Sequence, residues 1–410
     1  MRAYLFLLTA TGLPIAVSLV LAPLITASIS TLEYGSYVNY LTLLGATNIL
    51  VGFASAGYIS NAYIHPQSSD QIVSSMFSFM LLSIAPAAAV AAVVTYLSAD
   101  LPMMTVTVAL VSTGVCAYIT TSFQSFAILR RQYGLLLLVA LSQIIAQIVV
   151  VGILILSSSV SLGGLILGNL AGSALACACA IVLWRRLGFR FVRPRCESLQ
   201  KILLYAIPLV PHMLLSLASG SFDRWYLVGA EKLDDLAVYA VASSVAGMVL
   251  ILLDMGNKVY SPSVFEKLKT SNRIVRSYLV RAGFFVALSL AAGVAVAAAG
   301  YWFVLHAFHR DYAKAAWLCV SLALASSCYS IYFAASPFLY FFNKTGYVFS
   351  SSLAGAVATI AFSMLLYEPL QLYGLVAGRL IGFLVSGLVA LGFACHLITE
   401  NHVSPGGISR

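Results

Sequence analysis

Charged residues are scarce in this chain. Asp, Glu, Lys and Arg make up 9% of its 410 residues, only 13 residues are acidic, and 61% are hydrophobic. A soluble domain carries about 25% charged and about 45–50% apolar residues. The apolar residues here form runs of about 20 or more, the length of a helix that crosses some 30 Å of hydrocarbon. The composition excludes an ordinary water-soluble domain and predicts an all-α polytopic membrane protein.

Sequence motifs for catalysis and metal binding are also missing. No Ser-His-Asp, Asp-x-Asp or metal-ligand spacing is visible, and the longest external loop expected, near 223–235, has about a dozen residues. Six of the seven cysteines lie inside apolar runs, which is typical of small apolar filler and not of a disulfide framework. A membrane enzyme such as a polysaccharide polymerase or glycan ligase is therefore disfavoured, and no cofactor is expected.

Twelve membrane-spanning helices are predicted from the apolar runs, joined by connections too short to form a separate domain outside the membrane. They cover residues 3–27, 38–60, 72–97, 101–128, 134–156, 161–184, 202–228, 236–258, 278–302, 314–341, 346–367 and 371–397.

The distribution of positive charge predicts the orientation of these spans. Seventeen of the 22 Lys and Arg residues fall on one side of the predicted membrane, four fall on the other, and Arg379 falls within a span. Because Lys and Arg accumulate on the cytoplasmic side, both termini are expected in the cytoplasm. The net charge of +9 is then mostly a topology signal, and no nucleic acid is needed to explain it.

Two pairs of segments occupy corresponding places in the two halves of the chain. TLEYGSYVNY at 31–40 and KLDDLAVYAV at 232–241 each join the first two predicted spans of a half. GLILGN at 164–169 and GLVAGR at 374–379 each open the last span of a half. Landmarks that match in order as well as in content indicate a duplicated unit. The alternative is chance, because Gly-x-x-x-Gly is common in packed membrane helices.

Duplication predicts two six-helix lobes, 1–184 and 202–410, joined by a basic cytoplasmic linker, 185–201. Six is even, so the copies face the same way, and this parallel repeat places a cavity between the lobes. Pro14 and Pro208 are expected to kink the first helix of each lobe. The linker is expected to set topology and to contact anionic membrane lipids.

The two halves resemble the Wzx-type O-antigen and polysaccharide flippases. The first 60 residues share with that family a Pro-containing first helix, the Glu-Tyr-Gly-x-Tyr turn at 33–37 and a Gly-rich second helix. YAIPLVPHMLLSLASGSFDRWYLVG at 205–229 is similar to its recurring Ile-Pro helix that ends in Asp-Arg. VYAVAS at 238–243 follows at the family's Gly-x-Tyr-x-x-Ala turn, with Ala237 where Gly is usual.

This resemblance implies the superfamily that also holds multidrug (MATE-type) exporters and peptidoglycan-precursor flippases. The implied cargo is an undecaprenyl-diphosphate-linked oligosaccharide, turned from the cytoplasmic to the periplasmic leaflet of a bacterial inner membrane by rocking of two lobes. The resemblance also implies a monomer that serves polysaccharide assembly together with other assembly proteins. The composition by itself indicates no particular cargo.

Arg379 is the clearest candidate for contact with an anionic head group. A charge near the membrane centre costs about 2.5–3.5 kcal/mol on insertion scales, which makes intramembrane charges candidates for function. Its guanidinium could hold a phosphate through two hydrogen bonds. The structural alternative is an Arg that caps carbonyls or pairs within its own lobe. The repeat counterpart of Arg379 is Asn169, so the internal symmetry does not require a cation there.

Asp223 and Arg224 end the seventh predicted span. Arg224 is a candidate for the head group or sugar, and Asp223 is a candidate protonatable or ion-binding carboxylate. The alternative is an interfacial pair that locks the seventh and eighth spans. Asp254 and Lys258 stand four residues apart, in the order that favours a pair within one helix. Asp254 is the further candidate for proton or sodium coupling.

Two other polar groups are candidate contacts for the cargo. Arg310 and Lys314 could receive a diphosphate at the outer start of the tenth span, or could belong to an ordinary solvated loop. Asn61 and His65 could meet sugar hydroxyls at the end of the second span, or could be explained by helix capping.

The main competing function is a cation-coupled multidrug exporter of the MATE type. An exporter of organic cations would need acidic residues deep in its cavity. Asp223 and Asp254 are the candidates, and each stands beside a base in the sequence. Arg379 favours an anionic cargo. The coupling source remains open between a proton gradient, a sodium gradient and the membrane potential.

Overall fold

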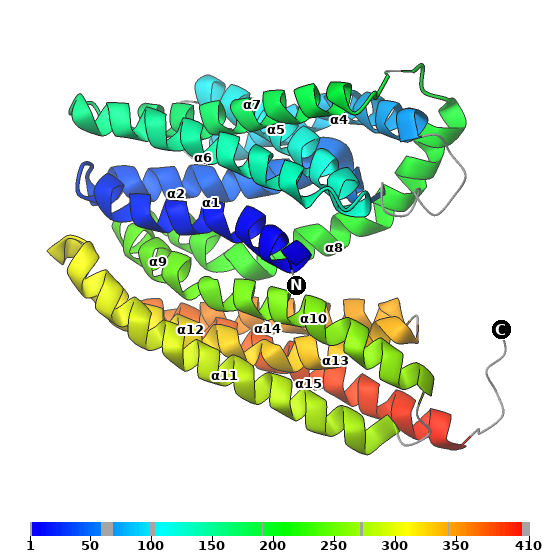
Figure 1. Ribbon diagram of the computed structural model, residues 1–410. Helices are drawn as coiled ribbons and strands as arrows, with labels where there is room; N and C mark the ends of the chain where they lie inside the picture. Colours follow the sequence, from blue (N-terminus) through cyan, green and yellow to red (C-terminus); the bar gives the residue numbers. More distant parts are fainter. Residues whose placement is uncertain are drawn as a thin grey trace. The chain divides into compact units, whose positions relative to one another are not determined.

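The computed structural model describes residues 2–58, 69–97, 103–190, 192–270, 274–342 and 344–403, and every regular element in these ranges is a helix (Figure 1). Nine helical stretches of the described residues are long and apolar enough to cross a membrane. The other three predicted spans fall on α1 (Arg2–Thr26), on α2 (Thr31–Leu50) with the 3₁₀ helix η1 (Val51–Gly57), and on α8 (Cys196–Gly229). The all-helical membrane architecture is confirmed, and the count of twelve stays a prediction.

Contacts divide the chain into two units. Unit 1 comprises Met1–Leu217 and Arg224–Ala237, and unit 2 comprises Ala218–Asp223 and Val238–Arg410. α8 and α9 (Leu233–Ala246) therefore each contribute residues to both units. The sequence analysis assigned 202–217 to the second lobe, whereas their contacts lie with unit 1. The lobes as evolutionary repeats stay a prediction.

Unit 1 is built around the indole of Trp184. Its ring meets Phe123 and Phe77 edge-on, with ring centroids 5.5 and 5.3 Å apart. Besides α1, α2, η1 and most of α8, the unit contains α4 (Ser69–Leu97), α5 (Met103–Leu129), α6 (Tyr133–Leu156) and α7 (Leu162–Arg186).

The second predicted span, 38–60, is broken after Leu50. Gly52 and Phe53 both have positive φ, +74° and +45°, a conformation that a regular helix does not contain. A Cβ at residue 52 would collide with the Tyr118 ring, so only glycine fits there. The Gly52 N–H donates to Ser83 Oγ at 2.7 Å, which satisfies a buried backbone group that the break exposes. A continuous span was therefore the wrong expectation for this stretch.

Unit 2 contains the end of α9 together with six longer helices and a short 3₁₀ turn. They are α10 (Met248–Thr270), α11 (Ile274–Ala307), η2 (Arg310–Tyr312), α12 (Lys314–Cys328), α13 (Ser330–Phe341), α14 (Thr345–Leu370) and α15 (Leu372–Val403).

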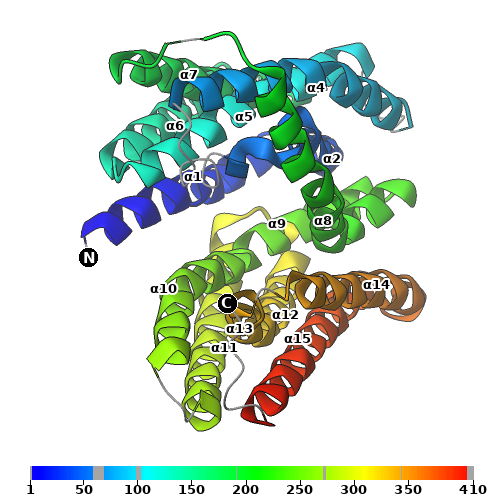
Figure 2. The same ribbon diagram turned by 90° about the vertical axis from the view of Figure 1, so that its right-hand side faces the viewer.

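Small residues bring α14 and α15 into close contact, and the two helices lie side by side in Figures 1 and 2. A Cβ at Gly378 would lie 2.7 Å from the Ser363 Cα, and one at Gly355 would lie 2.6 Å from the Ser386 Cβ. Small residues at such positions let helix backbones approach where no hydrophobic effect drives them together. The Gly-x-x-x-Gly of GLVAGR is part of this interface.

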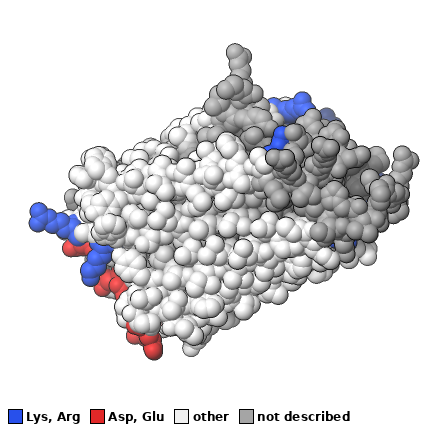
Figure 3. All heavy atoms as spheres, turned by 90° about the horizontal axis from the view of Figure 1, so that it is seen from below, with Lys and Arg blue, Asp and Glu red and all other residues white. Residues whose placement is uncertain are grey.

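Pro14 lies inside α1 and Pro208 lies inside α8. Proline has no backbone N–H to donate inside a helix, and the kinks themselves stay predictions. On the face in Figure 3, the described charged atoms gather at two opposite ends and the middle is uncharged, as a membrane-facing surface requires.

Candidate functional site

A buried ion pair lies at the junction of α8, α9 and α15 within unit 2. Arg379 Nη2 on α15 is 2.7 Å from Asp223 Oδ2 on α8, and the same nitrogen donates to the Gly220 carbonyl at 2.7 Å. The Tyr239 hydroxyl on α9 donates to the same Asp223 oxygen. The exposed fractions of the three residues are 8% for Arg379, 4% for Asp223 and 0% for Tyr239. Two opposite charges and a phenol thus form one desolvated cluster, called here the Asp223 cluster.

Each member of the Asp223 cluster is positioned by its helix. Arg379 follows Gly378, which packs against α14, and one residue turns the side chain by about 100° around the helix axis. Gly220 and Asp223 are three apart on α8, so the carbonyl and the carboxylate lie on one face of that helix. Residues 218–223 are the part of α8 whose contacts lie with unit 2.

The electrostatics of the cluster are balanced but its hydrogen bonding is incomplete. Removing ions from water costs several kcal/mol each, and their attraction repays this when the geometry is good. Nη2 makes both contacts of Arg379, while Nε is buried and has no hydrogen-bond partner among the described residues. A buried donor of this kind retains capacity for an acceptor from outside the protein.

The sequence analysis singled out Arg379 and Asp223 for different tasks, and the structure joins them. It considered Asp223 together with its neighbour Arg224, and the structure pairs Asp223 with Arg379. Arg224 is half-buried and belongs to unit 1. The alternative in which Arg379 pairs within its own lobe describes the observed contact. Tyr239 was not expected in the site, although its match to Tyr37 in the repeat was a signal.

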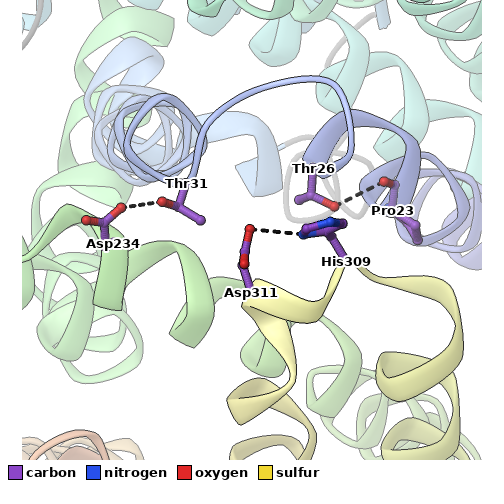
Figure 4. Close-up of polar contacts among 6 residues, drawn as sticks. All are labelled: Pro23, Thr26, Thr31, Asp234, His309 and Asp311. Atoms are coloured by element: carbon purple, nitrogen blue, oxygen red, sulfur yellow. Dashed lines mark hydrogen bonds and ion pairs between the residues drawn. The ribbon is translucent and has the colours of Figure 1, made fainter.

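The contacts of the Asp223 cluster given above involve none of the remaining candidates. Asp254 is exposed on α10. Arg310 and Lys314 are exposed at η2 and at the start of α12, where Asp311 contacts the His309 ring at 2.9 Å (Figure 4). Asn61 and His65 lie outside the described residues, as does the side chain of Lys258. Among the residues that are described, no cluster of His, Cys, Asp and Glu could hold a metal.

The two stretches that suggested a repeat contact each other within unit 1. The Thr31 hydroxyl at the start of α2 donates to Asp234 at the start of α9 (Figure 4). Four residues on, a Cβ at Gly35 would collide with the Leu233 carbonyl. Glycine is thus required at 35 by the close approach of α9, and Ala237 occupies the matching place in the predicted second copy.

Comparison with protein-family models gives no match, and no curated protein matches the sequence. Solved structures do match over nearly the whole chain. The lipid II flippase MurJ in an inward closed conformation has a TM-score of 0.72 at 14% identity, covering 97% of this chain and 90% of that one. An inward-facing MATE multidrug resistance transporter of the MOP superfamily has a TM-score of 0.69 at 13% identity, covering 96% and 95%. A point mutant of the Vibrio cholerae MATE transporter VcmN has a TM-score of 0.66 at 13% identity, covering 97% of this chain and 95% of that one. At these identities the fold is what is shared, so this chain is a multi-pass membrane protein with the fold of MATE transporters and the MurJ flippase.

Proposed function

We propose that the chain is a flippase that moves an undecaprenyl-diphosphate-linked oligosaccharide, an O-antigen or related polysaccharide repeat unit, from the cytoplasmic to the periplasmic leaflet. The fold is compatible with this activity because it is also that of a lipid II flippase. It is equally compatible with multidrug export. The choice between the two therefore depends on the chemistry of the Asp223 cluster.

One observation carries the choice, the guanidinium of Arg379 deep in an apolar helix. It lies seven residues into the candidate span Leu372–Leu397, about 10 Å along the helix axis. A diphosphate needs donors in fixed geometry, and Arg supplies them better than any other side chain. The buried Nε without a hydrogen-bond partner among the described residues is the donor that a phosphate oxygen would take.

Asp223 would act as the counterion that holds Arg379 until the cargo arrives. A phosphate that competes for the guanidinium leaves Asp223 with Tyr239, and proton uptake by the carboxyl would favour this exchange. Asp223 is in this way the coupling candidate inside the cluster, while Asp254 is the separate candidate on α10. The pathway uses no cofactor, and a proton gradient, a sodium gradient or the membrane potential would supply direction.

The topology that goes with this function has twelve spans in two parallel six-helix repeats with both termini in the cytoplasm. The protein works as a monomer in the bacterial inner membrane, among other polysaccharide assembly proteins. Access alternates between the two faces by rocking of the lobes.

A MATE-type exporter of organic cations is the second candidate, and the buried carboxylate of Asp223 is the observation in its favour. An anionic residue at depth could attract a cationic drug. Here, however, Arg379 neutralises that carboxylate at 2.7 Å, which weakens its field for a cation.

Leaflet transfer in proteoliposomes tests the proposal. The probe is a fluorescent undecaprenyl-diphosphate oligosaccharide, and the proteins are wild type, Arg379→Gln and Arg379→Lys, with Lys344→Gln as the matched control for loss of an exposed cation. Loss of one charge-assisted hydrogen bond is worth about 1.5–3 kcal/mol, so we expect Arg379→Gln to slow transfer about 10- to 100-fold. Arg379→Lys should recover part of the rate, and Lys344→Gln should transfer at the wild-type rate.

The outcomes separate the two functions. Transfer by wild type that survives Arg379→Gln would keep the flippase and return Arg379 to a structural role. Failure of wild type to move the lipid, combined with export of a cationic dye by the same vesicles, would replace the flippase with the multidrug exporter.

A further inference from the structure

An apolar groove of about 660 Å³ lies between α10 and α11 within unit 2, outside the Asp223 cluster. Leu252 and Gly256 line it from α10, and Phe284, Leu288 and Ala292 line it from α11. Phe284 and Leu288 are 70% and 59% exposed, so the groove is open along its side. Its volume falls in the range of about 300–1,000 Å³ that is typical of small-molecule sites.

The floor of the groove depends on a glycine, Gly256, whose lack of a side chain lets a ring pack closely against it. Gly256 lies under the Phe285 ring, and a Cβ there would be 3.2 Å from the ring carbon Cε2. Phe285 stacks on Tyr260 with centroids 4.8 Å apart, and the Tyr260 hydroxyl donates to the Ala334 carbonyl of α13 at 3.3 Å. The groove is therefore a shaped feature with a fixed wall.

The groove also has a polar end and an apolar end. Arg281 lines it and is the fourth residue of the span predicted at 278–302, so we expect its guanidinium at the membrane boundary. From there the lining extends to Ala292, eleven residues and about 16 Å along α11. This is half of the roughly 30 Å hydrocarbon thickness, which is the depth that one lipid chain occupies in its leaflet.

Arg281 supplies a positive charge that could bind an anionic head group. Within the part of the chain that the structure describes, it forms no ion pair with Asp or Glu. Basic pockets between membrane helices bind lipid phosphates in this way.

We propose that the groove between α10 and α11 is a binding site for an anionic phospholipid, with the phosphate on Arg281 and one acyl chain along the apolar wall as far as Ala292. Depth, polarity and charge each match this occupant, and the site is independent of the transported cargo. A zwitterionic lipid presents the same phosphate beside a positive amine, so it should bind more weakly to Arg281.

Native mass spectrometry of the purified full chain, from micelles with equal phosphatidylglycerol and phosphatidylcholine, tests the proposal. Arg281→Gln should lower retained phosphatidylglycerol at least threefold and remove the preference over phosphatidylcholine. Ala292→Trp, which fills the inner end of the groove, should lower retention of both lipids. Lys344→Gln, a cation outside the groove, and Leu290→Trp, an exposed position on the same helix outside the lining, should behave as wild type.

A thermal unfolding series distinguishes the lipid from its phosphate. Phosphatidylglycerol should raise the wild-type midpoint more than phosphatidylcholine does, and inorganic phosphate should leave it unchanged. The proposal fails if Arg281→Gln and Ala292→Trp both retain lipid as wild type does. It also fails if inorganic phosphate alone raises the midpoint as much as the lipid, because the site would then bind a free anion.

Discussion

The two units carry chemically different residues at matching positions of the predicted repeat. In unit 2 the last helix carries Arg379, which is held by Asp223 beside the buried hydroxyl of Tyr239. In unit 1 the residues that match them in the predicted repeat are Asn169 and Tyr37, and both are uncharged. The Asn169 Oδ1 is buried and has no hydrogen-bond partner among the described residues. One copy of the predicted repeat thus carries a charged cluster, and the other carries a neutral pair of residues.

Helix packing beside these residues is tighter in unit 2 than in unit 1. In α15, a Cβ at Gly378 would lie 2.7 Å from the backbone Cα of Ser363. In α7, a Cβ at the corresponding Gly168 would lie 3.5 Å from the Val150 side chain, an ordinary contact. The charged copy is therefore held in the tighter hairpin. A buried ion pair needs such fixed geometry, because its attraction must offset the loss of hydration.

The largest expected effect comes from breaking the ion pair. Arg379→Met leaves the Asp223 charge buried and should destabilise the protein by about 3–5 kcal/mol, whereas Asn169→Leu should cost about 0.6 kcal/mol. Unfolding midpoints in detergent measure both. The double variant Asp223→Leu with Arg379→Met should recover most of the loss, because it removes both charges. Equal effects at 379 and 169 would contradict the comparison.

Removal of the two corresponding hydroxyls should rank second. Tyr239→Phe removes a hydrogen bond to a carboxylate and should cost about 1.5–3 kcal/mol, while Tyr37→Phe removes a hydroxyl matched with a neutral residue and should cost less. The same unfolding assay compares them. A larger effect at Tyr37 would show that the neutral pair is the more important of the two.

Replacing the packed glycines by alanine should change the protein's stability in opposite directions in the two units. Gly378→Ala forces a methyl against the α14 backbone and should destabilise by about 1–3 kcal/mol. Gly168→Ala finds room and gains helix propensity, so it should stabilise by up to about 1 kcal/mol. Thermal midpoints of the two variants test this, and stabilisation by both would mean that α14 and α15 can separate slightly at no cost.

The smallest effect is expected at an exposed ion pair of nearly the same length. Lys201 Nζ is 2.6 Å from Glu197 Oε1, with side chains 47% and 72% exposed. The hydrogen bond from Lys201 lowers the pKa of the Glu197 carboxyl, so any stabilisation is present at neutral pH and is lost as the pH falls through that lowered pKa. Lys201→Met should leave the midpoint within error of wild type at pH 7. A clear loss there would show that distance, and not burial, governs these pairs.

Some parts of the fold could be predicted from local sequence and others could not. Nine of the predicted spans reappear as apolar helices because hydropathy over some 20 residues is a local property. The break after Leu50 was missed, because it depends on Tyr118 and Ser83, which follow it by more than 30 residues. Within the site, the cost of a charge in an apolar run singled out Arg379 and Asp223. Their partnership was missed because their nearest charged neighbours in sequence are different residues.

The sequence by itself determined that this protein lives in a membrane, is helical and repeats certain landmarks, because hydropathy and composition act residue by residue. Only the tertiary structure decided which helices meet, and hence that Asp223 neutralises Arg379, that Tyr239 joins them, and that α10 and α11 leave a groove ending at Arg281. The physical reason is the distance along the chain over which each interaction acts. Burial in lipid depends on each segment alone, whereas an ion pair, a small-residue contact or a groove needs groups from distant segments at separations of a few ångströms.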